Sequence, residues 1–329
     1  MKRFEISDWP TLVESLRRPY QKTYFAMYSS VYGGMVTDPR LMMLPIDDHM
    51  VHRGDGVFEA LKAVDGNIYN LNAHLERLVN SAHGIALDLP VSLGELTNII
   101  IETAHHAGHP TCMIRIYVSR GPGGFGVNPY ECPAPQLYVV ITQLGTPFMT
   151  LHPDGARICT SAIQAKSTDM AQIKNCNYAP NVLMKKEAVD QKFDFSMGFD
   201  ERGFLTEGAT ENMGIVTKDQ RLLFPNLGRI LTGTTMLRTL ALSQELVREG
   251  GLSFAGLANI TLQDILAARE LIITGTTINV VAGVEYDGHT IGTRKPGPIY
   301  QRLASLLEKD MKENPTVLTP FGGESLSYG

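Results

Sequence analysis

Lys174 is a candidate for amine chemistry because it precedes a predicted helix rather than lying on one. The surrounding stretch reads AQIKNCNYAPNVLMKKEA, with Asn175, Cys176 and Asn177 directly after the lysine. A lysine at such a junction can reach into a cleft, where loss of solvent lowers its pKa and makes the amine a usable nucleophile. The alternative is a solvated loop lysine, since most lysines are exposed.

Glu207 is a candidate partner for a cationic nitrogen. It lies in the sequence Thr206-Glu207-Gly208, at a predicted tight turn ahead of an apolar strand. A carboxylate in this place can hold a bound nitrogen protonated, because an adjacent opposite charge favours the charged form. The alternative is an ordinary acidic turn residue.

Two loops rich in threonine and glycine are candidate phosphate sites. LTGTT at 231–235 opens a predicted helix, and TGTT at 274–277 ends a predicted strand. Backbone N–H groups at a helix start, with hydroxyls beside them, bind phosphate, although threonine is equally suited to N-capping. Arg77, in HLERL on another predicted helix, could add a bidentate donor or could pair with Glu76 on a solvated face.

The combination of these residues favours one cofactor. Pyridoxal 5′-phosphate needs an amine for its aldehyde, a carboxylate for its ring nitrogen and donors for its phosphate. The chain offers all three, so the sequence predicts a pyridoxal-phosphate site. No metal site is expected, because His105, His106 and His109 have no nearby Glu or Cys to complete a ligand set.

Composition excludes several other classes of protein. The 329 residues are 43% hydrophobic and 19% charged, too apolar for a disordered chain. A net charge of −5 without a basic run argues against a general nucleic-acid binder or a membrane-surface protein. The first twenty residues have no apolar core of a secretory signal, and the four cysteines lie too far apart for a C-x-x-C site. We therefore expect a cytoplasmic protein.

Hydrophobic periodicity predicts two mixed α+β domains rather than a doubly wound parallel sheet. The first fifty residues are expected to be irregular. We predict an N-terminal extension over 1–25, a small α/β domain over 26–147 and a large cofactor-binding domain over 148–329. The expected elements of the small domain are a hairpin at 57–69, helices at 71–87 and 93–107, and strands at 113–120 and 136–144. Those of the large domain are strands at 156–163, 194–199, 212–217, 221–224, 270–274 and 278–285, and helices at 178–191, 235–247 and 297–312.

Several motifs in this order resemble the class IV aminotransferases, which are fold type IV pyridoxal-phosphate enzymes. The family includes branched-chain aminotransferases, D-amino acid aminotransferases and aminodeoxychorismate lyases. The resemblance implies a D-amino acid aminotransferase-like fold. It covers most of the chain from about 50 to 285, in the motifs HRGDGVFEALK (52–62), HLERLVNSA (74–82), IKNCNYAPNVLMKKEA (173–188), LTEGATENMGIV (205–216), LTGTT (231–235) and TGTT (274–277).

The resemblance implies specific roles for residues of the cofactor site. Lys174 is similar to the lysine that bonds the cofactor aldehyde as an imine and then moves the proton at Cα. Glu207 resembles the partner of the ring nitrogen. Tyr178 resembles a tyrosine that hydrogen-bonds the phenolic oxygen, although its spacing from the lysine is one residue shorter here. The other implied cofactor contacts are Arg77, Leu231, Gly233, Thr234, Thr235, Gly275 and Thr276.

The resemblance also implies a substrate pocket. The stretch IRIYVSRGPGGFGVNP (114–129) is similar to a branched-chain aminotransferase segment, although Met113 replaces its usual tyrosine. Arg53 and Arg115 could together bind a substrate carboxylate; alternatively, Arg53 is a solvated rim residue and Arg115 pairs with an acid. The remaining implied pocket residues are Phe58, Phe125, Val127 and Thr277.

The resemblance implies a homodimeric aminotransferase that moves an amino group between an amino acid and a 2-oxo acid by ping-pong kinetics. The amino acid can be a branched-chain L-amino acid or a D-amino acid. Two other functions stay open at this point. One is an aminodeoxychorismate lyase with the same cofactor, and the other is a non-catalytic binding protein of the same fold, against which Lys174 and Glu207 count.

Overall fold

The computed structural model describes residues 1–163, 166 and 168–322 of the chain. Residue contacts divide the chain into two compact units. Unit 1 consists of Met1–Leu144, Asn175–Asn177 and the chain from Leu318 onward, and unit 2 consists of Gly145–Lys174 and Tyr178–Val317. The expected mixed α+β fold is confirmed, and each unit is described by itself.

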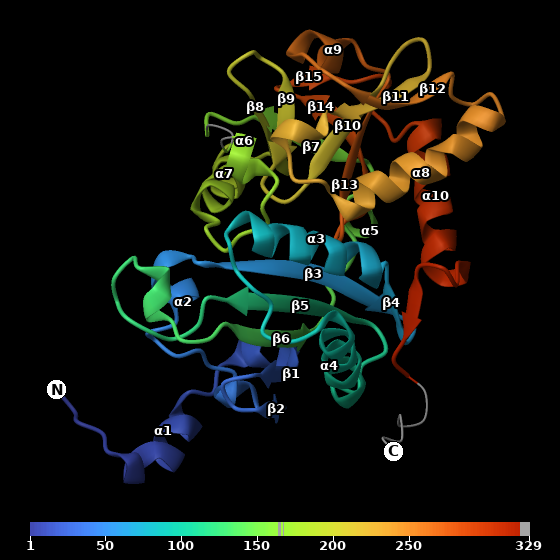
Figure 1. Ribbon diagram of the computed structural model, residues 1–329. Helices are drawn as coiled ribbons and strands as arrows, with labels where there is room; N and C mark the ends of the chain where they lie inside the picture. The colour runs from blue at the N-terminus through green and yellow to red at the C-terminus, as the bar shows by residue number, and fades with distance from the viewer. Residues whose placement is uncertain (164–165, 167, 323–329) are drawn as a thin grey trace. The chain divides into compact units, whose positions relative to one another are not determined.

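Unit 1 is built on an antiparallel sheet of seven strands in the order β16-β4-β3-β5-β6-β1-β2 (Figure 1). The predicted hairpin forms because Asp65-Gly66 supplies the left-handed turn that joins β3 to β4. The strands are β1 (Tyr24–Ser29), β2 (Gly34–Val36), β3 (Gly56–Val64), β4 (Asn67–Tyr69), β5 (Cys112–Ser119), β6 (Gln136–Thr142) and β16 (Leu318–Pro320).

Two amphipathic helices, α3 (Leu71–Gly84) and α4 (Leu93–His106), pack against this sheet and bury Leu75, Leu78, Leu96 and Ile100. The shorter helices of unit 1 are α1 (Trp9–Ser15), α2 (His49–Arg53) and the 3-10 turns η1 (Ile6–Asp8), η2 (Pro19–Thr23), η3 (Pro39–Leu41) and η4 (Pro129–Glu131).

The expectation that the first fifty residues are irregular is wrong. Strand β1 pairs with β6 on one side and β2 on the other, so it lies within the sheet. Its sequence YFAMYS alternates only in part, because both faces of the strand are half-covered, and this weakens the period-2 signal. Proline and glycine punctuation nearby further concealed the strand.

Unit 2 contains a nine-stranded mixed sheet in the order β12-β11-β10-β13-β14-β7-β8-β9, with β9 also pairing to β10 and β15 to β14. A core of buried aliphatic side chains, among them Ile158, Met197, Met213 and Leu271, lies against it. The strands are β7 (Ala156–Thr160), β8 (Phe195–Phe199), β9 (Leu205–Gly208), β10 (Asn212–Val216), β11 (Arg221–Pro225), β12 (Phe254–Ala258), β13 (Glu270–Gly275), β14 (Asn279–Tyr286) and β15 (His289–Thr290).

The longest helices of unit 2 confirm the predicted ones within a few residues. Helix α10 packs against α8 and β14 through Leu303 and Leu307 (Figure 1). The helices are α5 (Phe148–Leu151), α6 (Thr168–Ala171), α7 (Ala179–Asp190), η5 (Leu227–Arg229), α8 (Thr234–Arg248), α9 (Leu262–Ala267) and α10 (Pro298–Glu313).

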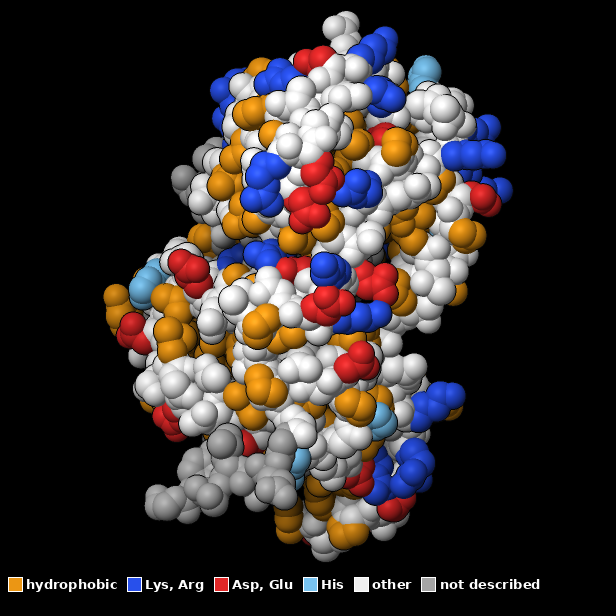
Figure 2. All heavy atoms as spheres, turned by 90° about the vertical axis from the view of Figure 1, so that its right-hand side faces the viewer, with side chains coloured by type: hydrophobic (Ala, Val, Ile, Leu, Met, Phe, Trp, Pro, Cys, Tyr) orange, Lys and Arg blue, Asp and Glu red, His pale blue; other side chains and the backbone are white. Residues whose placement is uncertain are grey.

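Positive and negative side chains are mixed over the face drawn in Figure 2, as the small net charge suggests. Within the described ranges, none of the helices is both long and apolar enough to cross a membrane.

Candidate functional site

The predicted cofactor residues of unit 2 gather around Asn212, the first residue of β10. In the sheet, Asn212 is paired with Glu207 of β9 on one side and with Thr274 of β13 on the other. The Asn212 Nδ2 donates to the Leu231 carbonyl over 3.1 Å. One buried amide therefore links Glu207 to both threonine–glycine loops. Sequence reasoning missed Asn212, although it lies inside the motif LTEGATENMGIV.

The Glu207 carboxylate lies in a strongly desolvated place. Burial raises its pKa to about 7, against the lowering effects of the Leu231 N–H, Lys166 and Lys174. The Leu231 N–H donates to Glu207 Oε2 over 2.9 Å. A carboxylate held this way gains much from a cationic partner, because an adjacent positive charge removes the cost of its ionisation. It can therefore bind and protonate a ring nitrogen.

Tyr178 lies beside two lysines. The Lys174 Nζ is 5.8 Å from the centre of the Tyr178 ring, and the Lys166 Nζ is 4.8 Å from it. Tyr178 occupies the N-cap position of α7, where Pro180 in the first turn fixes the start of the helix. Lys166 was not singled out from the sequence, because it lies outside every motif that carried the prediction.

The LTGTT loop is shaped around its glycine. A Cβ added to Gly233 would lie 1.9 Å from the Asn212 Oδ1, so only glycine allows this close approach. Gly233 is the N-cap of the 15-residue helix α8, and no described side chain caps that end. The N–H groups of the first turn, with the buried Thr234 and Thr235, form a cradle suited to an anion.

The second loop ends β13 next to the same amide. The Thr274 Oγ1 donates to the Asn212 carbonyl over 3.4 Å, and Gly275 and Thr276 follow it at partly buried positions. Thr277 is exposed.

Arg77, the predicted phosphate ligand in unit 1, is held by a buried carboxylate. The Nε and Nη2 of Arg77 donate to Glu59 over 2.7 and 2.8 Å, and the His74 Nδ1 lies 2.7 Å from Glu59 Oε2. Burial alone would raise the pKa of Glu59, but Arg77 and His74 outweigh it and hold that pKa well below its usual range. The pair fixes the direction of the Arg77 guanidinium on α3.

Arg115 lines a hollow of about 540 Å³ on the sheet of unit 1. The Arg115 Nη1 donates to the Thr142 Oγ1 over 2.8 Å, and Phe58 stacks on Tyr117 with ring centres 5.9 Å apart. The expectation that Arg115 pairs with an acid finds no such ion pair in the described part of unit 1. The other residues that line the hollow are Thr23, Tyr24, Met27, Met42, Leu44, Met50, Tyr117, Tyr138, Val140, Thr142 and Gln143.

Lys62 lies on the same sheet face, paired with Met113 across the strands. Burial lowers its pKa to about 7, and its Nζ lies 5.8 Å from the centre of the Tyr69 ring. The sequence analysis did not single it out, because a lysine inside a strand is normally solvated.

Arg53 uses its guanidinium on the loop that carries Phe125 and Val127. The Arg53 Nε donates to the Gly126 carbonyl over 3.1 Å, and Nη2 donates to the Phe125 carbonyl. Phe125 and Val127 are 62% and 81% exposed on this loop. The three residues thus form one structural group, in which Arg53 fixes the loop backbone.

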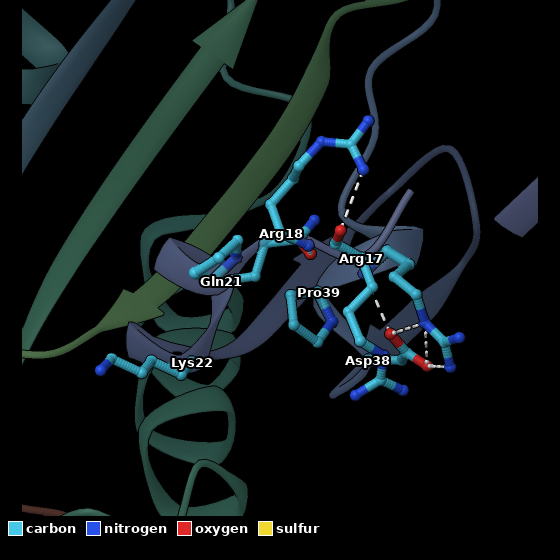
Figure 3. A pocket seen from close by; sticks show the side chains of 8 residues that line it. Arg17, Arg18, Gln21, Lys22, Asp38 and Pro39 are labelled. Carbon is cyan, nitrogen blue, oxygen red and sulfur yellow. Dashed lines mark hydrogen bonds and ion pairs between the residues drawn. The ribbon is translucent and has the colours of Figure 1, made fainter. Parts of the chain in front are cut away.

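A second hollow, of about 500 Å³, lies beside the N-terminal segment (Figure 3). It is lined by Arg17, Arg18, Lys22 and Arg40, among others. Arg40 is paired with Asp38 and with Glu14, and Arg18 donates to backbone carbonyls. None of the predicted site residues lines this hollow.

The residues of unit 2 fit pyridoxal 5′-phosphate. Lys174 offers an amine, Glu207 offers a carboxylate that gains from a cation, and the Gly233 cradle leaves room for an anion because a side chain there would fill it. This donor set is the one that an aldehyde, a pyridine nitrogen and a phosphate require.

The matched family is the class described as "Amino-transferase class IV", and the match spans residues 56–286. The chain belongs to this family. It is 35% identical over 302 residues to a "D-amino-acid transaminase, chloroplastic" of Arabidopsis thaliana, a match that covers 91% of this chain and 80% of the relative. It is 30% identical to a "Putative branched-chain-amino-acid aminotransferase" of Methanocaldococcus jannaschii, over 82% of this chain and 92% of the relative.

Solved structures agree with this membership. A bacterial-type branched-chain amino acid aminotransferase, from the source abbreviated T.th. and with pyridoxamine 5′-phosphate, superposes with a TM-score of 0.83 at 25% identity, over 91% of this chain and 99% of that chain. The aminotransferase chemistry, the pyridoxal-phosphate cofactor and the fold type IV architecture predicted from the sequence are thereby confirmed.

Proposed function

We propose that this class IV aminotransferase moves an amino group from an amino acid to a 2-oxo acid in two half-reactions, with Lys174 as its catalytic residue. The observation that carries the proposal is the convergence on Asn212 of Glu207 and both threonine–glycine loops, with Lys174 at the Tyr178 ring. Amine, carboxylate and anion cradle thus belong to one site.

The cofactor, when bound, supplies an electron-accepting ring. The Lys174 amine holds the cofactor covalently at its aldehyde carbon, and after the substrate amine replaces it, Lys174 removes the proton from the substrate Cα. Glu207 keeps a proton on the ring nitrogen. Tyr178 is proposed to donate to the phenolic oxygen. The phosphate would be held by Arg77, Thr235 and Thr276 with the backbone of Gly233, Thr234 and Gly275, and Leu231 would pack on the ring.

Arg115 is the proposed partner of the substrate carboxylate. It is the cation among the residues lining the 540 Å³ hollow, and guanidinium groups bind carboxylates in a bidentate manner. Phe58, Phe125, Val127 and Thr277 are proposed to line the pocket, and Arg53 contributes by fixing the loop. The 35% identity to a D-amino-acid transaminase favours D-amino acids, whereas the methionine and leucine side chains beside Arg115 favour a branched apolar substrate.

A half-reaction screen tests the substrate class. The cofactor-loaded protein is mixed singly with D-Ala, D-Glu, L-Leu and L-Val, and the loss of the cofactor-lysine absorption is followed. A response to the D-amino acids alone excludes the branched-chain assignment, and a response to L-Leu excludes strict D-specificity. Pyruvate release from aminodeoxychorismate without an amino acceptor would instead indicate the lyase.

Borohydride reduction followed by peptide mapping tests the site itself. The cofactor label is expected on Lys174, and Lys174→Ala is expected to lose the label and at least about a thousandfold in turnover. Lys186→Ala is the matched control, because Lys186 is an exposed lysine on α7 paired with Asp190. A label on another side chain overturns the assignment.

A homodimer in the cytoplasm is proposed as the working state of the enzyme. The family resemblance supports the dimer, and exposed apolar side chains of unit 1, namely Val31, Tyr32, Val51, Phe125 and Val127, are suited to an interface. Sedimentation equilibrium is expected to give twice the chain mass of 36.2 kDa. A monomer over the whole concentration range would contradict the dimer.

A further inference from the structure

One tyrosine ring in unit 2 is shared by two lysines. The Lys166 Nζ lies 4.8 Å from the centre of the Tyr178 ring and the Lys174 Nζ lies 5.8 Å from it. Aromatic faces attract cations, but two ammonium groups on one ring also repel each other. Such an arrangement needs a negative charge nearby, and Glu207 is the carboxylate whose field both lysines feel.

The charges around Glu207 can be stated in full. Lys166 and Lys174 favour its ionised form, Glu211 opposes it, and the Leu231 N–H donates to it. Of the two lysines, Lys166 has the larger effect. Burial lowers the pKa of Lys166, and the charge of Glu207 works against that lowering. The two groups therefore stabilise each other's charged forms.

We propose that Lys166 is a positioning residue of the cofactor site, a second cation that keeps the Glu207 carboxylate ionised and ready for a ring nitrogen. The inference rests on the proposed role of Lys174. Because the Lys174 amine is used to bond the aldehyde, its positive charge is not available to Glu207 throughout the reaction. Lys166 has no covalent role and supplies a constant charge.

The burial of Lys166 supports a functional role over a structural one. A half-buried ammonium group is costly to desolvate, and an apolar side chain of similar length would pack on Tyr178 without that cost. Perturbed lysines next to a carboxylate in a binding site are typical of functional sites. The position lies eight residues before Lys174, outside the motifs that suggested the site.

The test compares Lys166→Met, Lys166→Arg and the control Lys186→Met by spectrophotometric titration with pyridoxal 5′-phosphate from pH 6 to 9. Loss of the nearby cation raises the pKa of Glu207 by about one unit. Lys166→Met is therefore expected to bind about tenfold more weakly at pH 6 and equally well at pH 9. Lys166→Arg and Lys186→Met are expected to follow the wild-type profile.

A Glu207→Gln background separates the charge effect from packing. There, Lys166→Met is expected to change the affinity by less than about twofold, because no carboxylate is left to ionise. An equal loss in both backgrounds, or a wild-type pH profile for Lys166→Met, overturns the inference. If Lys166→Met folds poorly, the pH dependence of unfolding of cofactor-free Lys166→Gln gives the same answer, since its midpoint must move upward.

Borohydride mapping distinguishes this failure from failure of the proposed function. A label on Lys174 together with an unchanged pH profile in Lys166→Met removes the inference alone. A label on Lys166 in the wild-type protein overturns both, because Lys166 would then be the bonding lysine.

Discussion

Two buried carboxylates, Glu59 in unit 1 and Glu207 in unit 2, meet opposite fates. Glu59 is 0% exposed and accepts hydrogen bonds from Arg77 and His74, so its charge is compensated within the unit. Glu207 receives one backbone N–H, and burial raises its pKa to about 7. A compensated carboxylate fixes its neighbours, whereas an undercompensated one stores affinity for a cation that arrives from outside.

Glu59→Gln is expected to have the largest effect on stability. It leaves Arg77 and His74 without their counter-charge, and breaking a buried pair costs about 3–5 kcal/mol. Denaturant unfolding of the cofactor-free protein measures the loss. The double variant Glu59→Gln, Arg77→Met is expected to recover part of it, since no uncompensated guanidinium remains. A loss below about 1 kcal/mol, the size typical of surface pairs, would show that Glu59 is not the compensated carboxylate described here.

Glu207→Gln is expected to act in the opposite direction. A folded pKa of about 7 in place of 4.5 means that the wild-type protein loses stability as the pH rises from about 4.5 to 7. Removing the carboxylate therefore stabilises the cofactor-free protein by about 3 kcal/mol at pH 8, and hardly at all at pH 4. Thermal unfolding at both pH values checks the sign, and cofactor affinity is expected to fall in the same variant.

Gly233→Ala tests how closely the site is built around Asn212. The added Cβ would lie 1.9 Å from Asn212 Oδ1, so the loop or the amide must move. Overpacking of this kind costs about 1–3 kcal/mol, and cofactor affinity is expected to fall with it. Gly228→Ala is the matched control, because a Cβ there meets nothing within 4 Å. Equal behaviour of the two variants would show that the cradle is not tight.

Arg53→Ala gives the smallest expected effect. Its hydrogen bonds to the Phe125 and Gly126 carbonyls lie at an exposed site, so the loss of global stability is about 1 kcal/mol or less. Hydrogen exchange or proteolysis of the loop at 121–128 is expected to speed up. A higher KM at unchanged kcat fits a loop-fixing role, and an unchanged KM with unchanged exchange contradicts it.

The fold and most of the site were predictable where the evidence is local. The helices at α3, α4, α7, α8 and α10 and the hairpin of β3 and β4 follow from periodicity and turn residues over short stretches. Strand β1 was missed because its burial comes from partners distant in sequence, β2 and β6. Asn212 and Lys166 were missed for the same reason: each has its partners in other segments.

The sequence by itself determined the chemistry, because an amine, a carboxylate and two threonine–glycine loops are a set of residue types in a fixed order. It could not determine which carboxylate would be compensated. That depends on which side chains three-dimensional packing brings to each acid, and on how much water it removes. Glu59 gains a guanidinium from α3, while Glu207 gains one backbone N–H and the fields of two lysines.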